Sequence, residues 1–439
     1  MIDINILRKN PEILYESQRR RFQGTEIIDN AKKLDEEWRF TLKESNDLKS
    51  QKNKIVRQIA ENTRKGLPID DLRAEALKID ERISKLEENL RKIENERDQI
   101  LMKIPNIVDF EAPVAPDDAG NKPILFWGKA RVYKGYLENF KRSSLDSMDF
   151  ELIDFKPLSH VDLLQQKDFV DLERAAKVAG SRFYYLKRDL VLLELSLQLY
   201  ALKFLAQRGF KIIEPPYMLN RYSMEGATDF SAFEDTIYKI EGDELYLIAT
   251  SEHPLAAMHS DEILEENSLP LLYGGISPCF RREAGAHGKD TKGIFRVHQF
   301  NKIEQFAYTK PEDSKNFHKM LLENAMEFFK SLEIPFRVVD IATGDLGNVA
   351  SRKFDIEAWY PAQGQFREVV SASNVLDYQA RRLKIRYRTK EGNKFVHTLN
   401  STLVATTRAL VAIVENFQES DGRIIVPKVL RDFIGKDEI

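Results

Sequence analysis

The hydrophobic positions of residues 31–100 repeat in steps of four and three residues, the spacing of a coiled-coil seam. One stripe has a single polar member, Arg97, and comprises Leu72, Ala76, Ile79, Ile83, Leu86, Leu90, Ile93, Arg97 and Ile100. The second stripe is weaker because three of its eight positions are polar; it comprises Leu34, Trp38, Thr41, Ser45, Leu48, Lys52, Ile55 and Ile59. Residues 66–69 indicate a turn, and Asp70 is a candidate N-cap. The pattern predicts two long helices folded back as an antiparallel hairpin.

Short apolar runs replace the heptad pattern beyond a proline-rich linker that contains Pro105, Pro113, Pro116 and Pro123. These runs predict strands at residues 210–213, 245–248, 295–306, 337–339, 354–359, 366–370 and 384–388, and helices at residues 190–206 and 403–416. Several strands follow one another without a helix between them, which favours a mostly antiparallel sheet. We therefore expect an α+β protein with a helical arm over residues 1–108 and a globular domain over residues 109–439.

Charge is concentrated in the predicted hairpin, where nearly half of the residues are charged. The whole chain of 439 residues has 67 Lys and Arg against 70 Asp and Glu, a net charge of −3, which excludes a generally basic nucleic-acid coat protein. The seam alone leaves two interpretations open. The hairpin is either an oligomerisation coiled coil or an arm whose lysines and arginines reach a large partner such as a nucleic acid.

The remaining composition indicates a cytoplasmic protein. A single cysteine, Cys279, excludes a disulfide framework and a thiolate metal cluster. The first residues lack the basic and apolar segments of a signal peptide, and residues 191–206 are too short and too polar to span a bilayer. We also find no P-loop and no glycine-rich dinucleotide motif that opens a helix.

An unusual polar strand is the first candidate for a functional site. Alternation along residues 296–304 places Arg296, His298, Phe300, Lys302 and Glu304 on one face. A basic, aromatic and acidic face suits a nucleotide, because arginine binds phosphate, an aromatic ring stacks on a base and a carboxylate accepts from an amine. The alternative is an exposed strand with cross-strand ion pairs.

Several short sequence segments, taken in their order along the chain, resemble the motifs of the class II aminoacyl-tRNA synthetases. Arg281-x-Glu283 followed by His298-Gln299-Phe300 and Glu304 resembles motif 2, residues 209–216 resemble motif 1, and residues 402–415 around Arg408 resemble motif 3. Thr250-Ser251-Glu252 is similar to the serine loop of the seryl-tRNA synthetase family, and residues 180–183, 366–374 and 396–400 are also typical of it. The helical arm is a hallmark of the same family, so the resemblance covers the whole chain.

The resemblance implies a site for ATP. Arg281 would bind the α-phosphate, Glu283 the adenine amine and Arg296 the γ-phosphate, while Phe300 and Arg408 would stack on the two faces of adenine. Glu368 and Ser371 would hold Mg²⁺ with the phosphates. The full implied ATP set is Arg281, Arg282, Glu283, Arg296, Val297, Phe300, Glu368, Val369, Val370, Ser371 and Arg408. Catalysis would rest on Arg281, Glu368 and Arg408.

The resemblance also implies a site for L-serine, formed by Thr250, Ser251, Glu252, Arg281, Glu304, Asn400 and Thr402. Acidic and hydroxyl groups suit a substrate with an ammonium and a hydroxyl, and they would stay unpaired with alanine. The implied activity is that of a serine–tRNA ligase acting on tRNA(Ser) in a homodimer that pairs through motif 1. The sequence leaves open whether tRNA(Sec) is also charged.

Three alternative functions fit the sequence less well. Related synthetases for threonine, proline or histidine carry a C-terminal anticodon-binding domain, and only 31 residues follow Arg408. A ligase that charges a carrier protein would lack the arm, and a degenerate coiled-coil scaffold would not need Arg281, Glu283 and Arg408. Residues 129–157 stay unassigned, as an additional tRNA contact or a surface hairpin.

Overall fold

The computed structural model describes residues 1–284, 290 and 292–439, and it divides into two compact units, residues 1–107 and 108–439. Residues 285–289 and 291, which lie between the Arg281-x-Glu283 string and His298, are outside the described residues. None of the helices in the described ranges carries an apolar stretch that could cross a lipid bilayer.

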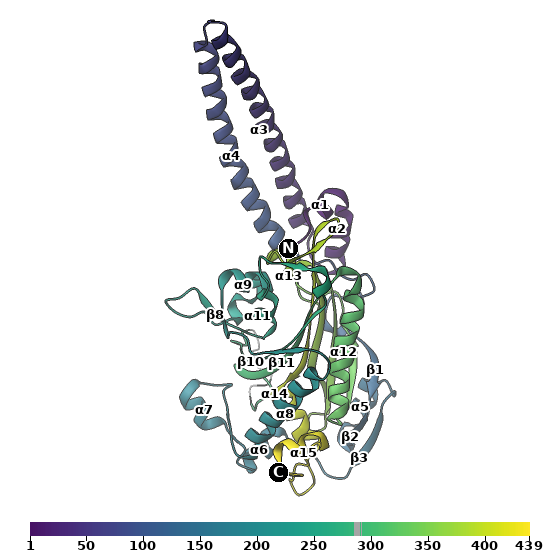
Figure 1. Cartoon of the computed structure of the whole chain (residues 1–439). Coiled ribbons are helices and arrows are strands. Elements are labelled where there is room, and N and C mark those ends of the chain that lie inside the picture. Colours follow the sequence, from purple (N-terminus) through teal and green to yellow (C-terminus); the bar gives the residue numbers. More distant parts are fainter. Residues whose placement is uncertain (285–289, 291) are drawn as a thin grey trace. The chain divides into compact units, whose positions relative to one another are not determined.

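The first unit is entirely helical and contains the predicted hairpin, which is confirmed (Figure 1). Its helices are α1 (Ile4–Lys9), α2 (Pro11–Arg20), α3 (Glu26–Arg64) and α4 (Asp70–Lys103). Every position of both seams is buried or half-buried along α3 and α4. The expected N-cap is wrong by one residue, because α4 begins at Asp70, and Ile69 is the cap residue without a side-chain cap bond.

The polar member of the seam, Arg97, is tied to charged and aromatic side chains near the base of the hairpin. Asp35 is almost fully buried and accepts ion pairs from Arg8 at 2.7 Å, Arg39 at 3.1 Å and Arg97 at 3.4 Å. The Arg97 guanidinium also lies 5.0 Å from the centre of the Trp38 ring. A buried charge needs such partners, so this cluster accounts for an arginine in an otherwise apolar stripe.

The second unit is built on an eight-stranded sheet in the order β1-β12-β13-β14-β17-β11-β10-β6. All neighbouring strands are antiparallel except β10 and β6, which confirms the α+β class and the mostly antiparallel sheet. Its strands are β1 (Lys122–Trp127), β6 (Lys211–Ile213), β10 (Leu271–Phe280), β11 (Gln299–Thr309), β12 (Phe336–Asp340), β13 (Arg352–Tyr360), β14 (Gln365–Leu376) and β17 (His397–Ala405).

Smaller sheets surround this one. They comprise β2 (Lys129–Tyr133) with β3 (Asp149–Ile153), β4 (Val170–Asp171) with β5 (Tyr185–Leu186), β7 (Met218–Asn220) with β8 (Leu245–Leu247), and β9 (Ile263–Glu265) with β15 (Arg386–Thr389) and β16 (Gly392–Phe395). The strands predicted near residues 245–248 and 384–388 therefore exist, but they belong to these smaller sheets.

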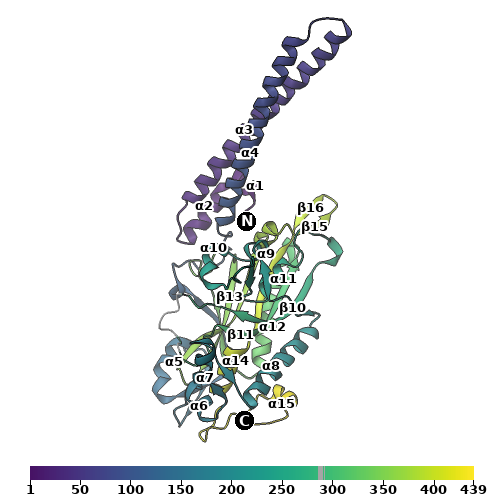
Figure 2. The same ribbon diagram turned by 90° about the vertical axis from the view of Figure 1, so that its left-hand side faces the viewer.

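Helices cover one face of the large sheet, as Figure 2 shows for α8, α12 and α14. The helices of this unit are α5 (Leu137–Ser144), α6 (His160–Gln166), α7 (Leu172–Ala179), α8 (Asp189–Ala206), α9 (Arg221–Ala227), α10 (Phe230–Phe233), α11 (Glu252–Ala257), α12 (Ser314–Ser331), α13 (Tyr378–Arg382), α14 (Thr406–Asn416) and α15 (Lys428–Ile434). Ile303 and Ala307 of β11 pack into the main apolar core with α8, α12 and α14. Phe306 and Tyr308 pack with Leu255 of α11 on the other face. Alternation therefore also turns Phe300, Lys302 and Glu304 away from the main core.

Two predicted boundaries are wrong. Strand β11 begins at Gln299 rather than residue 295, so Arg296 and His298 precede the strand and do not share its alternation. The His298 ring instead forms a 2.7 Å hydrogen bond with the carbonyl of Arg281. The predicted helix at residues 403–416 begins only at Thr406, because residues 403–405 complete β17, where Val404 and Ala405 lie opposite Ile303 and Lys302 of β11. An apolar run does not distinguish a buried strand from a buried helix.

The unassigned segment at residues 129–157 is not a hairpin. Strands β2 and β3 pair in parallel with α5 between them, and Phe140 of α5 packs against Trp359 and Phe366 of the large sheet. Arg131 donates to the carbonyls of Asn416 and Gln418 at 2.9 and 2.8 Å. This segment is therefore an integral layer of the second unit.

Candidate functional site

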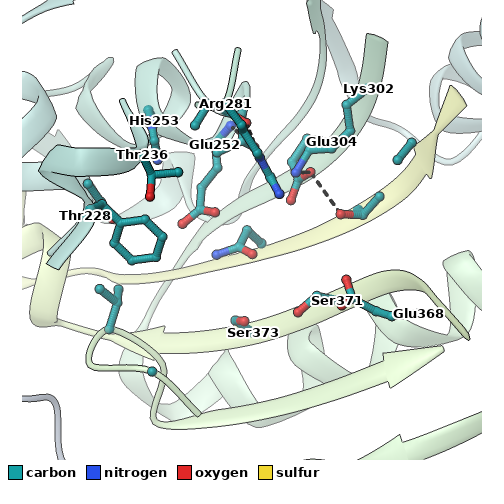
Figure 3. A pocket seen from close by; sticks show the side chains of 18 of the residues that line it. Thr228, Thr236, Glu252, His253, Arg281, Lys302, Glu304, Glu368, Ser371 and Ser373 are labelled. Atoms are coloured by element: carbon teal, nitrogen blue, oxygen red, sulfur yellow. Dashed lines mark hydrogen bonds and ion pairs between the residues drawn. The ribbon is translucent and has the colours of Figure 1, made fainter. Parts of the chain in front are cut away.

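A cavity of about 510 Å³ opens on the face of the sheet opposite α8, α12 and α14. Strands β11, β14 and β17 form its floor, and residues from α11, the end of β10 and the start of α14 form its walls. Its volume falls in the range of small-molecule sites. Figure 3 shows Glu252, Arg281 and Glu304 directed into the same space, with Glu368, Ser371 and Ser373 on the strand across from them.

One end of the cavity is acidic. Glu304 is 1 % exposed and forms an ion pair with Lys302 at 2.5 Å, and the Thr402 hydroxyl donates to the same carboxylate oxygen, Oε2, at 3.4 Å. On the facing wall, Gln379 donates to Glu252 at 3.1 Å. Gln379 is itself fixed because it also donates to the carbonyl of Ala227 and accepts from Thr398. Two carboxylates thus face one cavity, each held by neutral or cationic donors.

An irregularity in β17 brings Thr402 to Glu304. Lys302 lies opposite Ala405 and Ile303 opposite Val404, so regular pairing would place Leu403 opposite Glu304. The register shifts after Ile303, and Glu304 lies opposite Thr402. A bulge of this kind redirects a side chain next to a functional site, and here it replaces an apolar neighbour with a hydroxyl donor.

Burial shifts the protonation equilibria at this end. It raises the pKa of Glu252 to about 7, and the neighbouring Glu304 contributes to the increase. Burial also raises the pKa of Glu304, although Lys302 opposes the change. It lowers the pKa of His253 to about 3, with Lys302 and Arg281 acting in the same direction. This end therefore holds a neutral imidazole and a carboxyl group that titrates near neutral pH.

The other end of the cavity carries arginines and aromatic rings. The Arg281 guanidinium lies 5.2 Å from the centre of the Phe300 ring and is anchored by a 3.2 Å hydrogen bond from Nε to the carbonyl of Ala249. Arg408 lies 5.3 Å from the centre of the Phe295 ring and donates to the carbonyl and the carboxylate of Glu368, both at 3.1 Å. Planar cations beside aromatic rings form a place where a base can stack.

Neighbouring cations hold Glu368 in its ionised form. Its side chain is 47% exposed, and although partial desolvation raises its pKa, Arg408, Lys353 and Arg281 together outweigh that effect and lower the pKa. Ser371 lies on the same strand, β14, and both side chains line the cavity. A charged carboxylate beside a hydroxyl supplies hard oxygen ligands of the kind that Mg²⁺ binds.

Ion pairs behind the cavity wall hold the arginine-rich end in place. Arg367 of β14 binds Asp290 through two hydrogen bonds of 2.7 and 2.5 Å and lies 3.7 Å from the centre of the Phe295 ring. Arg296 donates to Glu283 at 3.2 Å and lies 3.9 Å from Asp290. Glu283 and Arg296, which the sequence assigns to adenine and the γ-phosphate, are therefore direct neighbours.

Most of the residues singled out in the sequence line this one cavity: Thr250, Glu252, Arg281, Glu283, Arg296, Val297, Phe300, Glu304, Glu368, Val369, Ser371, Asn400, Thr402 and Arg408. Ser251, Arg282 and Val370 lie outside the lining. The Ser251 hydroxyl donates to the carbonyl of Gly275 beneath the site, Val370 packs into the main core, and Arg282 is exposed.

The cavity also contains residues that the sequence did not assign. Ser373 follows Ser371 by two residues on β14, so alternation along that strand would have identified it. Phe295 and Thr407 adjoin assigned residues, and His253 follows the serine-loop string directly. By contrast, Thr228, Thr236 and residues 346–350 come from distant segments without a local pattern, and only the fold brings them to the cavity.

Comparisons with known proteins agree along the whole chain. Residues 1–108 match the seryl-tRNA synthetase N-terminal domain, and residues 234–417 match the tRNA synthetase class II core domain (G, H, P, S and T). A serine–tRNA ligase of Picrophilus torridus is 53% identical, over 100% of this chain and 99% of its own.

Two solved structures are similar over the full length. The seryl-tRNA synthetase of Pyrococcus horikoshii complexed with ATP is 52% identical with a TM-score of 0.97, covering 100% of this chain and 99% of its own. The cytoplasmic serine–tRNA ligase of Naegleria fowleri in complex with AMP is 39% identical with a TM-score of 0.88, covering 100% and 98%. Since relatives of this identity cover the chain from end to end, it belongs to the serine–tRNA ligase family, the seryl-tRNA synthetases of class II.

Proposed function

We propose that this protein activates L-serine with ATP and transfers the seryl group to the 3′ end of tRNA(Ser). The observation that carries the proposal is a single cavity with the half-buried Glu252 and the buried Glu304 at one end and arginines, aromatic rings and Glu368 at the other. The first end suits an ammonium and a hydroxyl, and the second suits a nucleotide. Relatives named serine–tRNA ligase and a similar structure that contains ATP support the same activity.

In the first step, the serine carboxylate attacks the α-phosphorus of ATP and expels pyrophosphate. Glu252, Thr250 and Glu304 would hold the ammonium and hydroxyl, so that the carboxylate points toward Arg281. Arg281 would bind the α-phosphate and stabilise the charge that develops there, while Phe300 and Arg408 would stack on adenine. None of these residues acts as a nucleophile, and the rate gain comes from orientation and electrostatic stabilisation.

Glu368 and Ser371 fit a magnesium ion that enters with ATP. Within the described residues, no group of three or more His, Cys, Asp or Glu side chains could hold a metal ion by itself. Phosphate and water would therefore complete the coordination. When bound, the ion would neutralise phosphate charge.

In the second step, a hydroxyl of the terminal tRNA ribose attacks the carbonyl carbon of seryl-adenylate, and AMP leaves. We propose that the hairpin of α3 and α4 binds the tRNA. The apolar seams of α3 and α4 cover each other within one chain, so the hairpin needs no helix from a second chain. Its exposed faces carry lysines and arginines that can follow a phosphate backbone. Whether tRNA(Sec) is also a substrate is decided by charging both tRNAs in parallel.

We also propose that two copies pair through α8 and β6. Leu192, Leu195 and Leu199 form an apolar stripe on α8, and Leu195 is 54% exposed. Ile212 of the adjacent edge strand β6 is also exposed. An exposed apolar stripe beside a free strand edge is typical of an interface, and this region contains the motif 1 resemblance. A cytoplasmic location remains part of the proposal.

The activity is tested by incubating the protein with ATP, Mg²⁺, labelled serine and a tRNA(Ser) transcript. We expect acid-precipitable seryl-tRNA that depends on ATP and on the tRNA. Formation of seryl-adenylate without transfer to this tRNA would instead favour a ligase for another acceptor, such as a carrier protein.

A further inference from the structure

Lys302 is a buried cation at the acidic end of the cavity to which the reaction above gives no role. It lines the cavity, its side chain is 8% exposed, and its ammonium lies 2.5 Å from Oε2 of Glu304. A lysine is rarely buried to this extent unless it is paired. The pair lies on the floor of the proposed serine site, so its role extends to the substrate.

The two oxygens of Glu304 have different surroundings. Oε2 forms the ion pair with the Lys302 ammonium and accepts the hydrogen bond from the Thr402 hydroxyl. Oε1 receives no hydrogen bond from any side chain in the described part of the chain. This division leaves one carboxylate oxygen available to a ligand and fixes the plane of the carboxyl group.

We propose that Lys302 is a specificity-determining positioning residue, which holds Glu304 as an oriented carboxylate whose Oε1 accepts the hydroxyl of serine. The inference rests on the proposed function and extends it to this side chain. Lys302 acts through Glu304 and does not contact the reacting atoms.

The surrounding charges explain why Glu304 needs this cation. Glu252 and neutral His253 face it from α11, Cys279 and Arg281 from β10 and its end, and Thr402 from β17. Arg281 is directed to the α-phosphate, so Lys302 is the cation dedicated to Glu304. Without Lys302, Glu304 would be buried opposite another carboxylate and would take up a proton.

Protonation of Glu304 would reduce both the affinity of the site for serine and its discrimination between serine and alanine. The carboxylic acid can itself donate, so the hydroxyl of serine would no longer be required as the donor at this position. Bound alanine would leave an ionised Glu304 without the hydroxyl that serine donates to it, and the site therefore rejects alanine. Loss of Lys302 should therefore lower activity with serine more than the residual activity with alanine.

The test is pyrophosphate exchange by Lys302→Met, Lys302→Arg and the wild type, with ATP and serine varied separately. Lys319→Met, which removes a lysine that is 76% exposed, is the matched control. We expect Lys302→Met to raise KM for serine about 10- to 100-fold, the range for losing a hydrogen bond to a charged group, with KM for ATP unchanged. Lys302→Arg should restore part of the loss, and Lys319→Met should match the wild type.

The pH profile separates this role from a structural one. Raising the pH should reduce the increase in KM for serine that Lys302→Met causes, because a higher pH favours the ionised form of Glu304. A defect that is equal for ATP and serine, a defect independent of pH, or a lower KM for serine would each overturn the proposal.

If Lys302→Met does not fold, Lys302→Gln carries the same expectations. A wild type without serine-dependent exchange would refute the proposed function and this inference together. An active wild type with a normal Lys302→Met variant would refute only the inference.

Discussion

Replacing Arg408 with alanine should weaken the use of ATP and leave serine binding largely intact. The side chain is 20% exposed and makes two hydrogen bonds of 3.1 Å to Glu368, one to its carbonyl and one to its carboxylate. It also lies beside the Phe295 ring, with its guanidinium facing the cavity. The substitution therefore removes the proposed platform for adenine and a counter-charge for Glu368 at the same time.

The magnitude follows from these contacts. A hydrogen bond to a charged group contributes about 1.5–3 kcal/mol. A cation stacked on an aromatic system adds about 0.5–2 kcal/mol. The terms overlap because one side chain makes both contacts, so we expect a total of about 2–4 kcal/mol. A loss of that size lowers kcat/KM for ATP about 30- to 1000-fold.

Pyrophosphate exchange measures the effect when ATP is varied at saturating serine and serine at saturating ATP. Arg408→Lys is the matched control, because it retains the charge and loses the planar fork, and it should give an intermediate loss. The reasoning is refuted if Arg408→Ala changes kcat/KM for ATP less than threefold, or if the constants for serine change by the same factor as those for ATP.

Four further predictions concern different parts of the molecule. Arg281→Ala should lower the exchange rate about 100-fold or more, as loss of a transition-state donor does, with an unchanged circular dichroism spectrum; an unchanged rate would remove Arg281 from the site. Because Glu252 must be ionised to bind an ammonium and its pKa is about 7, KM for serine should rise as the pH falls below 7, approaching tenfold per unit, and stay level above it; a flat profile from pH 5.5 to 8 contradicts this. Deleting residues 41–90 and closing the gap with a short turn should leave a dimer with serine-dependent exchange that has lost most tRNA charging; retained charging would show that the arm does not bind tRNA. Leu195→Glu should give a monomer by light scattering, whereas an unchanged mass would exclude α8 from the interface.

The sequence predicted the parts of the fold that local periodicity controls. The heptad step placed the hairpin because helix packing repeats every seven residues, and it failed only at the cap, where Ile69 takes the position given to Asp70. Residues 403–405 were assigned to a helix because a strand that is buried on both faces shows no alternation. Strand alternation was extended too far at His298, because nothing local marks the residue at which β11 begins.

The candidate site was predictable where it follows motifs and unpredictable where it depends on packing. Arg281, Glu304 and Arg408 stand in recognisable strings, and the fold brings them to one cavity. Ser251 stands in an equally recognisable string, yet its hydroxyl points to Gly275. The bulge that pairs Glu304 with Thr402 depends on the register of two strands far apart in sequence, which no local pattern determines.

The most direct test of the central claim is pyrophosphate exchange with ATP and each of the twenty standard amino acids at equal concentration. Our account predicts exchange with serine at least 100-fold above that with alanine or glycine, because the two carboxylates and Thr402 require both an ammonium and a correctly placed hydroxyl. Comparable exchange with any of these amino acids, or exchange that does not depend on an amino acid, would contradict the assignment of this cavity to serine.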